Sequence, residues 1–204
     1  MKKVIVLGCG MVGRAMAIDL AKQHDVTVTD INPESFDLLR SQNPRIKTSV
    51  LDVRMEDDLM AKISSCDVVL SAVPGFLGFK TLKHIITCKK NVIDISFFPE
   101  NALELNALAV KNNVTVIVDC GVAPGMDNII LGYHNERMKI TAFECLVGGL
   151  PKMKKWPFFY KAPFSPIDVI EEYTRPARYV ENGQIITKPA MSDTEYVQFK
   201  EVGT

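Results

Sequence analysis

Over residues 1–120, short apolar runs rich in Val and Ile alternate with longer segments whose apolar positions recur at helical spacing. The runs predict strands at Val4–Leu7, Val26–Thr29, Ile46–Leu51, Val68–Ser71, Val92–Ile95 and Val114–Val118. The intervening segments predict helices at Met11–Gln23, Pro33–Gln42, Glu56–Ser65, Phe76–Cys88 and Glu100–Asn112. Strands without strict alternation are buried on both faces, as in parallel sheets covered by helices. The predicted class is therefore α/β, a Rossmann-type doubly wound parallel sheet.

The pattern changes after Asp119, and six of the 11 prolines fall between Pro151 and Pro189. Here we expect a helix at Ala123–Arg137, a strand at Lys139–Val147, a helix from Pro166 to about Thr174 capped by Ser165, and a short strand at Ile185–Ile186. A lone long strand needs partners for its backbone groups, and nothing after Thr174 predicts a sheet. We therefore expect a Rossmann domain at 1–124 and an incomplete α+β substrate or dimerisation domain at 125–204. Its missing strands would come from a longer chain or from another chain.

A glycine loop, Gly8-Cys9-Gly10-Met11-Val12-Gly13, follows the first predicted strand and opens the first helix. In this βαβ context GxGxxG indicates dinucleotide binding. Gly8 makes the tight turn, Gly10 lets a pyrophosphate approach the backbone, and Gly13 lets the helix pack closely. The helix N-terminus then offers free N–H groups to the phosphates. A plain strand-to-helix turn is the alternative.

Asp30 ends the second predicted strand, 20 residues after Gly10. Its carboxylate is expected to accept hydrogen bonds from the adenosine ribose hydroxyls and to repel a 2′-phosphate, so NAD is favoured over NADP. The alternative for Asp30 is a cap on the next helix, for which Asn32 is better placed. Asp52, after the third strand, is expected either near the adenine edge or in a helix-capping turn.

Loops at the carboxyl ends of parallel strands line the ligand crevice. The expected cofactor contacts are Gly8, Gly10, Met11, Val12 and Gly13 in the first loop, Asp30, Ile31 and Asn32 in the second, Asp52 and Val53 in the third, and Ala72, Val73 and Pro74 in the fourth. The segment Asp94-Ile95-Ser96-Phe97-Phe98, which follows the fifth strand, is expected to face the same crevice.

Composition excludes several other classes. The 24 basic and 24 acidic side chains balance, which argues against a nucleic-acid partner. No 18-residue apolar run predicts a membrane span, and the first apolar run is too short for a signal peptide, so a cytoplasmic location is expected. The five cysteines are dispersed without a CxxC pair, and the three histidines are equally scattered. We therefore expect reduced thiols and no metal site.

Four later blocks carry a resemblance to a known family. They are Asp119-Cys120-Gly121-Val122-Ala123-Pro124-Gly125-Met126-Asp127-Asn128, then Gly148-Gly149-Leu150-Pro151, then Phe164-Ser165-Pro166, and finally Pro176-Ala177-Arg178-Tyr179-Val180-Glu181-Asn182-Gly183. In type and order they resemble the saccharopine dehydrogenase family, which includes saccharopine reductases and L-lysine 6-dehydrogenases. The glycine loop is shared with many families, whereas these blocks together are specific. The resemblance extends from Lys3 to Gly203.

The resemblance implies an NAD(P)-dependent oxidoreductase of lysine or other amino-acid metabolism. Hydride would pass between the nicotinamide and the CH–NH carbon of a lysine- or saccharopine-like substrate. It also implies a homodimer and a chain that continues beyond this sequence. Near the substrate it places Ser96, Phe97, Asp127, Gly148 and Gly149. Asp127 is the catalytic candidate, as ammonium ligand or general base, and the alternative is a first-turn carboxylate that complements the helix dipole. For Gly148 and Gly149 the alternative is a tight turn.

Two other classes compete with this prediction. The first 30 residues also resemble NAD-binding regulatory domains of potassium transport proteins, which would make the chain a non-catalytic sensor. Those domains lack the PGMDN and GGLP blocks. Methyltransferases also combine a glycine-rich loop with an acid after the second strand, but Gly13 and the PGMDN block disfavour them.

Overall fold

The computed structural model describes residues 1–157, 159–162 and 164–200. The chain divides into two compact units, Met1–Cys145 and the residues from Leu146 onward. Each unit is described by itself.

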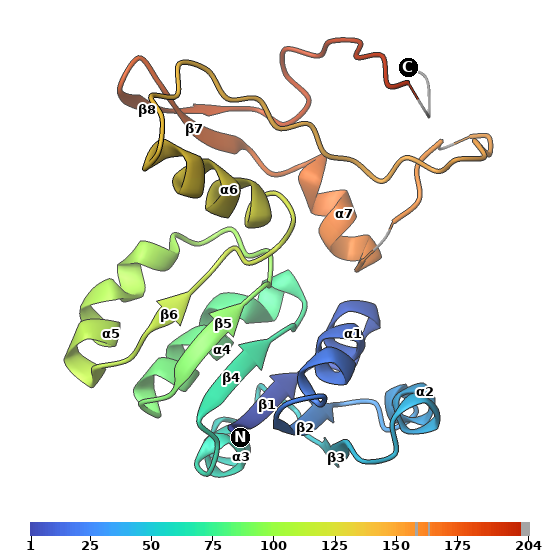
Figure 1. The fold of residues 1–204 in the computed structure, drawn as a ribbon, viewed down its shortest axis with the longest axis vertical. Coiled ribbons are helices and arrows are strands. Elements are labelled where there is room, and N and C mark those ends of the chain that lie inside the picture. The colour runs from blue at the N-terminus through green and yellow to red at the C-terminus, as the bar shows by residue number, and fades with distance from the viewer. Residues whose placement is uncertain (158, 163, 201–204) are drawn as a thin grey trace. The chain divides into compact units, whose positions relative to one another are not determined.

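The first unit is built on a six-stranded parallel sheet (Figure 1). Its strands are β1 (Lys3–Leu7), β2 (Asp25–Asp30), β3 (Lys47–Val50), β4 (Val68–Ser71), β5 (Asn91–Asp94) and β6 (Val116–Ile117). They lie in the order β3-β2-β1-β4-β5-β6, and every neighbouring pair is parallel. This is the doubly wound order of dinucleotide-binding folds, so the predicted fold class is confirmed.

Helices connect the strands of this sheet. They are α1 (Met11–Leu20), α2 (Ser35–Gln42), α3 (Glu56–Ile63), α4 (Gly75–Thr87), the 3₁₀ turn η1 (Ala102–Leu105), α5 (Asn106–Asn112) and, after β6, α6 (Met126–Asn135). The single helix predicted at Glu100–Asn112 is therefore two elements. Asn101 caps the first of them, because its side chain accepts a hydrogen bond from Leu103 N–H. Asn32 does not cap α2 directly; its side chain accepts the N–H of Glu34, the residue that precedes the helix.

The central strand β1 shows why both faces of the sheet are covered. Val4 and Val6 belong to one buried cluster, with Ala17 of α1 and Phe36 and Leu39 of α2. Ile5 and Leu7 belong to the other, whose helical members come from α3, α4 and α5: Leu59, Ile63, Leu82, Ile85, Ile86 and Ala109. Successive side chains of a strand point to opposite faces, so an uninterrupted apolar run requires helices on both sides.

The strand predicted at Lys139–Val147 is wrong. These residues have no regular secondary structure, and neither do Gly148–Leu150, which follow them. A β-strand exists only when a neighbour accepts and donates its backbone hydrogen bonds. No described strand pairs with this segment, so its apolar composition alone does not form a ladder.

The second unit contains α7 (Pro166–Glu172) and an antiparallel hairpin of β7 (Ala177–Glu181) and β8 (Gln184–Lys188). Ser165 precedes α7 as predicted, although its side chain makes no capping hydrogen bond. The expectation that nothing after Thr174 forms a sheet is wrong. Asn182 and Gly183 join the two strands with φ of 51° and 78°, the left-handed geometry of a tight hairpin turn. The Asn-Gly pair was the available sequence signal.

Candidate functional site

The carboxyl ends of β1 and β4 mark the point where the strand order reverses. β1 pairs with β2 on one side and with β4 on the other, so the chain leaves these two strand ends in opposite directions. Ligands of open α/β sheets bind in the crevice outside this point. Three of the predicted cofactor loops begin at β1, β2 and β4, so the fold brings them to this one edge of the sheet.

Gly8 closes the turn between β1 and α1. Its φ is +102°, and a Cβ placed there would lie 2.5 Å from the carbonyl oxygen of Ala72. Its N–H donates to the carbonyl of Thr29 on β2 at 2.8 Å. Both the dihedral angle and the close approach of the β4 loop require glycine.

The two later glycines have different surroundings. A Cβ at Gly13 would collide with the carbonyl oxygen of Gly8, so Gly13 lets α1 pack against the turn. A Cβ at Gly10 would meet no heavy atom within 4 Å, and its φ of −68° is accessible to any residue. The fold itself therefore does not require glycine at position 10, and the open space is what a phosphate group needs to approach the backbone.

The N-terminus of α1 begins at this open space. Gly10 is the residue before the helix, no described side chain caps it, and the first turn holds no acidic residue. Met11 and Val12 are exposed on the same turn. Uncapped N–H groups and the positive end of the helix dipole make such a terminus an anion-binding site.

Asp30 links the end of β2 to the glycine loop. Its Oδ2 accepts the backbone N–H of Cys9 at 2.7 Å, and its Oδ1 accepts that of Asn32 at 2.9 Å. The carboxylate therefore lies beside the glycine loop, where the sequence predicted a ribose-binding acid. Ile31 follows it with an exposed side chain.

Asp52 is held by Arg54 at the end of β3. The Arg54 guanidinium donates from Nη2 to Oδ2 at 2.6 Å and from Nε to both carboxylate oxygens at 2.9 and 3.0 Å. These hydrogen bonds lower the pKa of Asp52 to about 2. The Asp52 carbonyl also accepts from Met55 N–H at 3.0 Å, just before α3, which is the turn geometry considered as the alternative. Val53 packs partly buried against the core.

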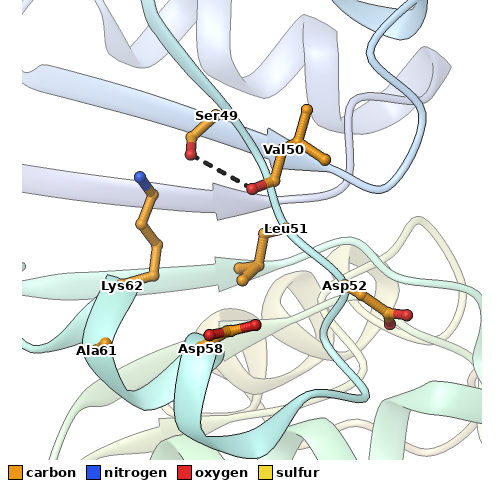
Figure 2. A pocket seen from close by; sticks show the side chains of 7 residues that line it. All are labelled: Ser49, Val50, Leu51, Asp52, Asp58, Ala61 and Lys62. Carbon is orange, nitrogen blue, oxygen red and sulfur yellow. Dashed lines mark hydrogen bonds between the residues drawn. The ribbon is translucent and has the colours of Figure 1, made fainter.

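A cavity of about 510 Å³ lies between the end of β3 and α3. Figure 2 shows its lining, with Asp52 at the opposite end from Lys62. The lining residues are Ser49, Val50, Leu51, Asp52, Asp58, Ala61 and Lys62. Asp52 is the one residue it shares with the predicted cofactor contacts, and no residue of the glycine loop lines it. This cavity is therefore not the crevice at the switch point.

The loop after β4 lines the crevice with backbone groups more than with side chains. Val73 is buried in the core, so its side chain faces away from the crevice. Ala72 packs against the glycine turn, with its Cβ 3.4 Å from a Cβ placed at Gly13. Pro74 is exposed and precedes α4.

Ser96, predicted near the substrate, is buried in the loop after β5. Its hydroxyl and its N–H both donate to Oδ1 of Asp94, and a Cβ at Gly78 of α4 would collide with its side chain. Phe97 follows it with a half-buried side chain. The sequence placed Asp94 in the segment expected to face the crevice but assigned it no role of its own, although an acid directly after an apolar strand run was an available signal.

Asp127 lies in the first turn of α6 and orders the loop before it. Its Oδ1 accepts the N–H of Gly125 at 2.8 Å, and Gly125 has φ of +143°. Backbone bonds from Met126 N–H to Gly121 and from Asp127 N–H to Val122 close the same loop. One carboxylate oxygen of Asp127 therefore has a structural role, since it holds the loop before α6 in place.

Gly148 and Gly149 belong to the second unit. A Cβ at Gly149 would lie 2.8 Å from the Tyr160 ring and 2.5 Å from the Lys161 carbonyl oxygen, while the Gly149 carbonyl accepts Lys161 N–H at 2.9 Å. Within this unit, the space beside Gly149 is taken by the chain itself.

The described part of the chain contains no group of three or more His, Cys, Asp or Glu residues that could hold a metal ion. Within the same ranges, none of the helices has the length and apolar character needed to span a bilayer.

The sheet order, the glycine loop at its switch point and the acid at the end of β2 define a dinucleotide-binding fold of the kind found in nicotinamide-dependent oxidoreductases. Comparison with known families makes the assignment specific. A family model described as the saccharopine dehydrogenase NADP binding domain matches residues 4–117, and the saccharopine dehydrogenase C-terminal domain matches residues 121–203. The chain belongs to the saccharopine dehydrogenase family, which confirms the resemblance read from its sequence.

Curated relatives agree with this assignment. Mitochondrial alpha-aminoadipic semialdehyde synthase of Rattus norvegicus is 26% identical over 195 residues, which are 91% of this chain and 21% of the relative. Saccharopine dehydrogenase [NADP(+), L-glutamate-forming] of Saccharomyces cerevisiae is 28% identical over 194 residues, 91% of this chain and 44% of the relative. The chain thus spans less than half the length of these two relatives.

A solved structure supports the fold. The chain resembles apo histidine-tagged saccharopine dehydrogenase (L-Glu forming) from Saccharomyces cerevisiae with a TM-score of 0.67 at 24% identity. The match covers 98% of this chain and 48% of that one.

Proposed function

We propose that this chain is the cofactor-binding part of an oxidoreductase that acts on the CH–NH bond of an amino acid. The observation that carries the proposal is the geometry of the glycine loop in a member of this family. Gly8 and Gly13 are required by packing, whereas Gly10 leaves room beside an uncapped helix N-terminus. A strand-to-helix turn that binds no ligand would still need glycine at positions 8 and 13, but it would not need the open space at Gly10.

For the form of the cofactor, two arguments point in different directions. The names of the family model and of the yeast relative specify NADP and favour it over the NAD predicted from the sequence. In this chain, however, Asp30 places a carboxylate against the glycine loop, where the ribose of the adenosine half would bind. A 2′-phosphate would meet that negative charge, whereas ribose hydroxyls would donate to it. We therefore propose NAD for this chain. A Kd for NADPH at or below that for NADH would overturn this choice.

The site residues have the following proposed roles. Gly8, Gly10 and Gly13 with Met11 and Val12 hold the pyrophosphate, and Asp30, Ile31 and Asn32 hold the adenosine side. Asp52 and Val53 border it, and Ala72, Val73 and Pro74 flank the nicotinamide through their backbone. When bound, the nicotinamide accepts or returns the hydride of the substrate carbon. Ser96 and Phe97 belong to the loop that borders the substrate.

On the substrate side we propose Asp127 as a ligand of the substrate ammonium group. Its Oδ1 is occupied by Gly125 N–H, while its Oδ2 has no hydrogen bond from the described residues. A carboxylate that is fixed through one oxygen presents the other in a defined direction, which favours a charged hydrogen bond. Gly148 and Gly149 are proposed to border the substrate in the complete protein.

The domain boundary, assembly and location are also proposals. The two family models divide the chain between residues 117 and 121, which supports a Rossmann domain at 1–124 and a partial second domain at 125–204. The homodimer and the cytoplasmic location stay predictions, and the rat relative is named mitochondrial. A non-catalytic NAD-binding module is the alternative function and is not favoured, because residues 121–203 match the second domain of the enzyme family.

The natural full-length protein tests this proposal. Absorbance of the reduced nicotinamide should rise on addition of saccharopine, lysine or a related diamino acid with NAD or NADP. Asp127→Asn should then raise KM more than it lowers kcat if the carboxylate binds the ammonium group. Tight cofactor binding without turnover across the panel would instead favour the non-catalytic module.

A further inference from the structure

Asp94 is a completely buried acid at the cofactor edge of the sheet. It is the last residue of β5 and lies in register with Ser71, the last residue of β4. Its carbonyl oxygen accepts Cys120 N–H at 3.2 Å from the segment after β6. A charged side chain is almost never fully buried without a partner, so its surroundings need a physical explanation.

The two oxygens of the Asp94 carboxyl differ in their contacts. Oδ1 accepts the N–H of Ser96 at 2.8 Å and also the Ser96 hydroxyl. Oδ2 makes no hydrogen bond to the described residues, and neither does the buried Oγ of Ser71. The Ser71 hydroxyl is nevertheless close enough to act on the ionisation of the carboxyl. One oxygen thus fixes the loop after β5, while the other lies near the end of β4 as an unsatisfied polar atom.

The charges around Asp94 favour its neutral form. Burial raises its pKa, the Ser96 hydrogen bonds and the nearby Ser71 hydroxyl oppose that effect, and the negative charge of Asp119 raises the pKa further. Burial and the negative charges of Asp119 and Asp94 likewise raise the pKa of the neighbouring Cys120 thiol. None of these neighbours is a cation. A buried carboxyl without a cation is more stable when it carries a proton, and Oδ2 can then donate that proton to the Ser71 oxygen.

We propose that Asp94 is a positioning residue whose neutral carboxyl joins the end of β4 to the loop after β5, with Oδ1 accepting from Ser96 and Oδ2–H donating to Ser71. The inference depends on the proposed function, in which these two loops flank the nicotinamide. Loss of the proton leaves a buried anion that draws water in and separates the loops. Cofactor affinity then falls as pH rises, because contacts to the nicotinamide weaken while contacts to the rest of the cofactor stay unchanged.

The packing of Ser96 explains why the junction matters for position. Ser96 is pinned between Asp94 and the bare backbone of Gly78, because any side chain at 78 would collide with it. The T-shaped ring pair of Phe79 and Phe98, with centroids 5.7 Å apart, joins the same loop to α4. The Asp94 carboxyl is the link that extends this packing to β4.

Two neutral variants separate positioning from bulk stability. Asp94→Asn keeps the geometry, since its amide oxygen accepts from Ser96 and its amide N–H donates to Ser71, but it has no proton to lose. Asp94→Ala removes both contacts. Asp67→Asn is the matched control, because Asp67 lies at the amino edge of the sheet, where its Oδ2 accepts Lys3 N–H at 2.7 Å.

The measurement is the Kd of the full-length protein for NADH and for ADP-ribose, which lacks the nicotinamide, as the pH is raised from the ordinary carboxyl pKa of 3.8 to alkaline values. For the wild type and Asp67→Asn, Kd for NADH should rise about tenfold per pH unit once Asp94 is mostly ionised. Asp94→Asn should hold the low-pH value throughout, and Asp94→Ala should bind NADH weakly at every pH. ADP-ribose should bind all four proteins alike.

Other results would overturn the proposal. If wild type and Asp94→Asn show the same pH dependence, the proton of Asp94 does not position the loops. If Asp94→Ala does not fold, the comparison of wild type with Asp94→Asn still decides whether the proton of Asp94 positions the loops. If ADP-ribose affinity falls together with NADH affinity in the Asp94 variants, the residue supports the whole sheet edge and not the nicotinamide loops. Failure of the wild type to bind either ligand would instead refute the proposed function.

Discussion

Gly10→Ala separates the ligand-binding role of the glycine loop from its structural role. The backbone at Gly10, with φ of −68° and ψ of −171°, is accessible to alanine, and an added methyl group meets no atom within 4 Å. Replacing glycine where its dihedrals allow alanine stabilises by about 0.4–1 kcal/mol through the unfolded state. Alanine is a poorer residue than glycine before a helix, which costs a similar amount. We therefore expect the free energy of unfolding to change by less than about 0.5 kcal/mol.

Cofactor binding should change far more. The methyl group would occupy the space through which a pyrophosphate reaches the N-terminus of α1. Loss of one hydrogen bond to a charged group costs about 1.5–3 kcal/mol. The Kd for the dinucleotide should therefore rise roughly 10- to 150-fold.

Gly13→Ala is the matched comparison, because its methyl group would collide with the Gly8 carbonyl oxygen and pack 3.4 Å from the Ala72 side chain. Overpacking of this kind costs about 1–3 kcal/mol. Urea unfolding and cofactor titration of both variants form the assay. The reasoning is refuted if Gly10→Ala binds the cofactor like the wild type, or if it loses as much stability as Gly13→Ala.

Three further substitutions test the packing, a helix cap and the buried acid. Leu82→Ala on α4 should lower the free energy of urea unfolding by about 2–5 kcal/mol, because this side chain is completely buried; a loss below 1 kcal/mol would contradict the core described. Lys90→Met should cost about 1 kcal/mol in the same assay, since Nζ donates to the carbonyls of Ser64 at 2.6 Å and Cys66 at 3.0 Å just after α3; an unchanged midpoint would mean water replaces the ammonium group without loss. Asp94 has a raised pKa, so the folded wild type binds more protons than the unfolded chain and its stability falls as pH rises from 3.8 through the folded pKa, by at most about 1.4 kcal/mol per unit. Asp94→Asn should lack this loss, so its advantage in thermal unfolding should grow with pH and vanish below 3.8; an advantage that is constant with pH would argue against the shift.

The sequence predicted the parallel sheet because its signals are local. Each strand is a Val- and Ile-rich run, each connection has helical spacing, and the glycine loop identifies the first strand end. The positions of Gly8, Gly10 and Gly13 follow from the same local pattern. Within this sheet and its connections, the errors are boundaries of one to three residues and the split of the helix at 100–112.

The segments that failed depend on distant partners. Lys139–Val147 has the composition of a strand, but a strand needs a neighbour that a single sequence does not show. In the hairpin, the short strand predicted at Ile185–Ile186 is confirmed as part of β8, whereas β7 and the pairing were not predicted, although Asn182-Gly183 marks the turn. Asp94 was expected in the segment that faces the crevice, but its complete burial and its contact with Ser96 depend on the packed sheet edge and were not predicted.

The strand order also governs events during synthesis on the ribosome. β1 is complete on one side as soon as β2 has been made, but its other edge must wait for β4, and the interval from Asp30 to Ser71 takes about 2–8 seconds at usual elongation rates. During that interval the edge of Val4–Leu7 offers unpaired backbone groups and apolar side chains to any passing chain. The apolar edge of the central strand is therefore open to pairing with other chains until β4 has been made.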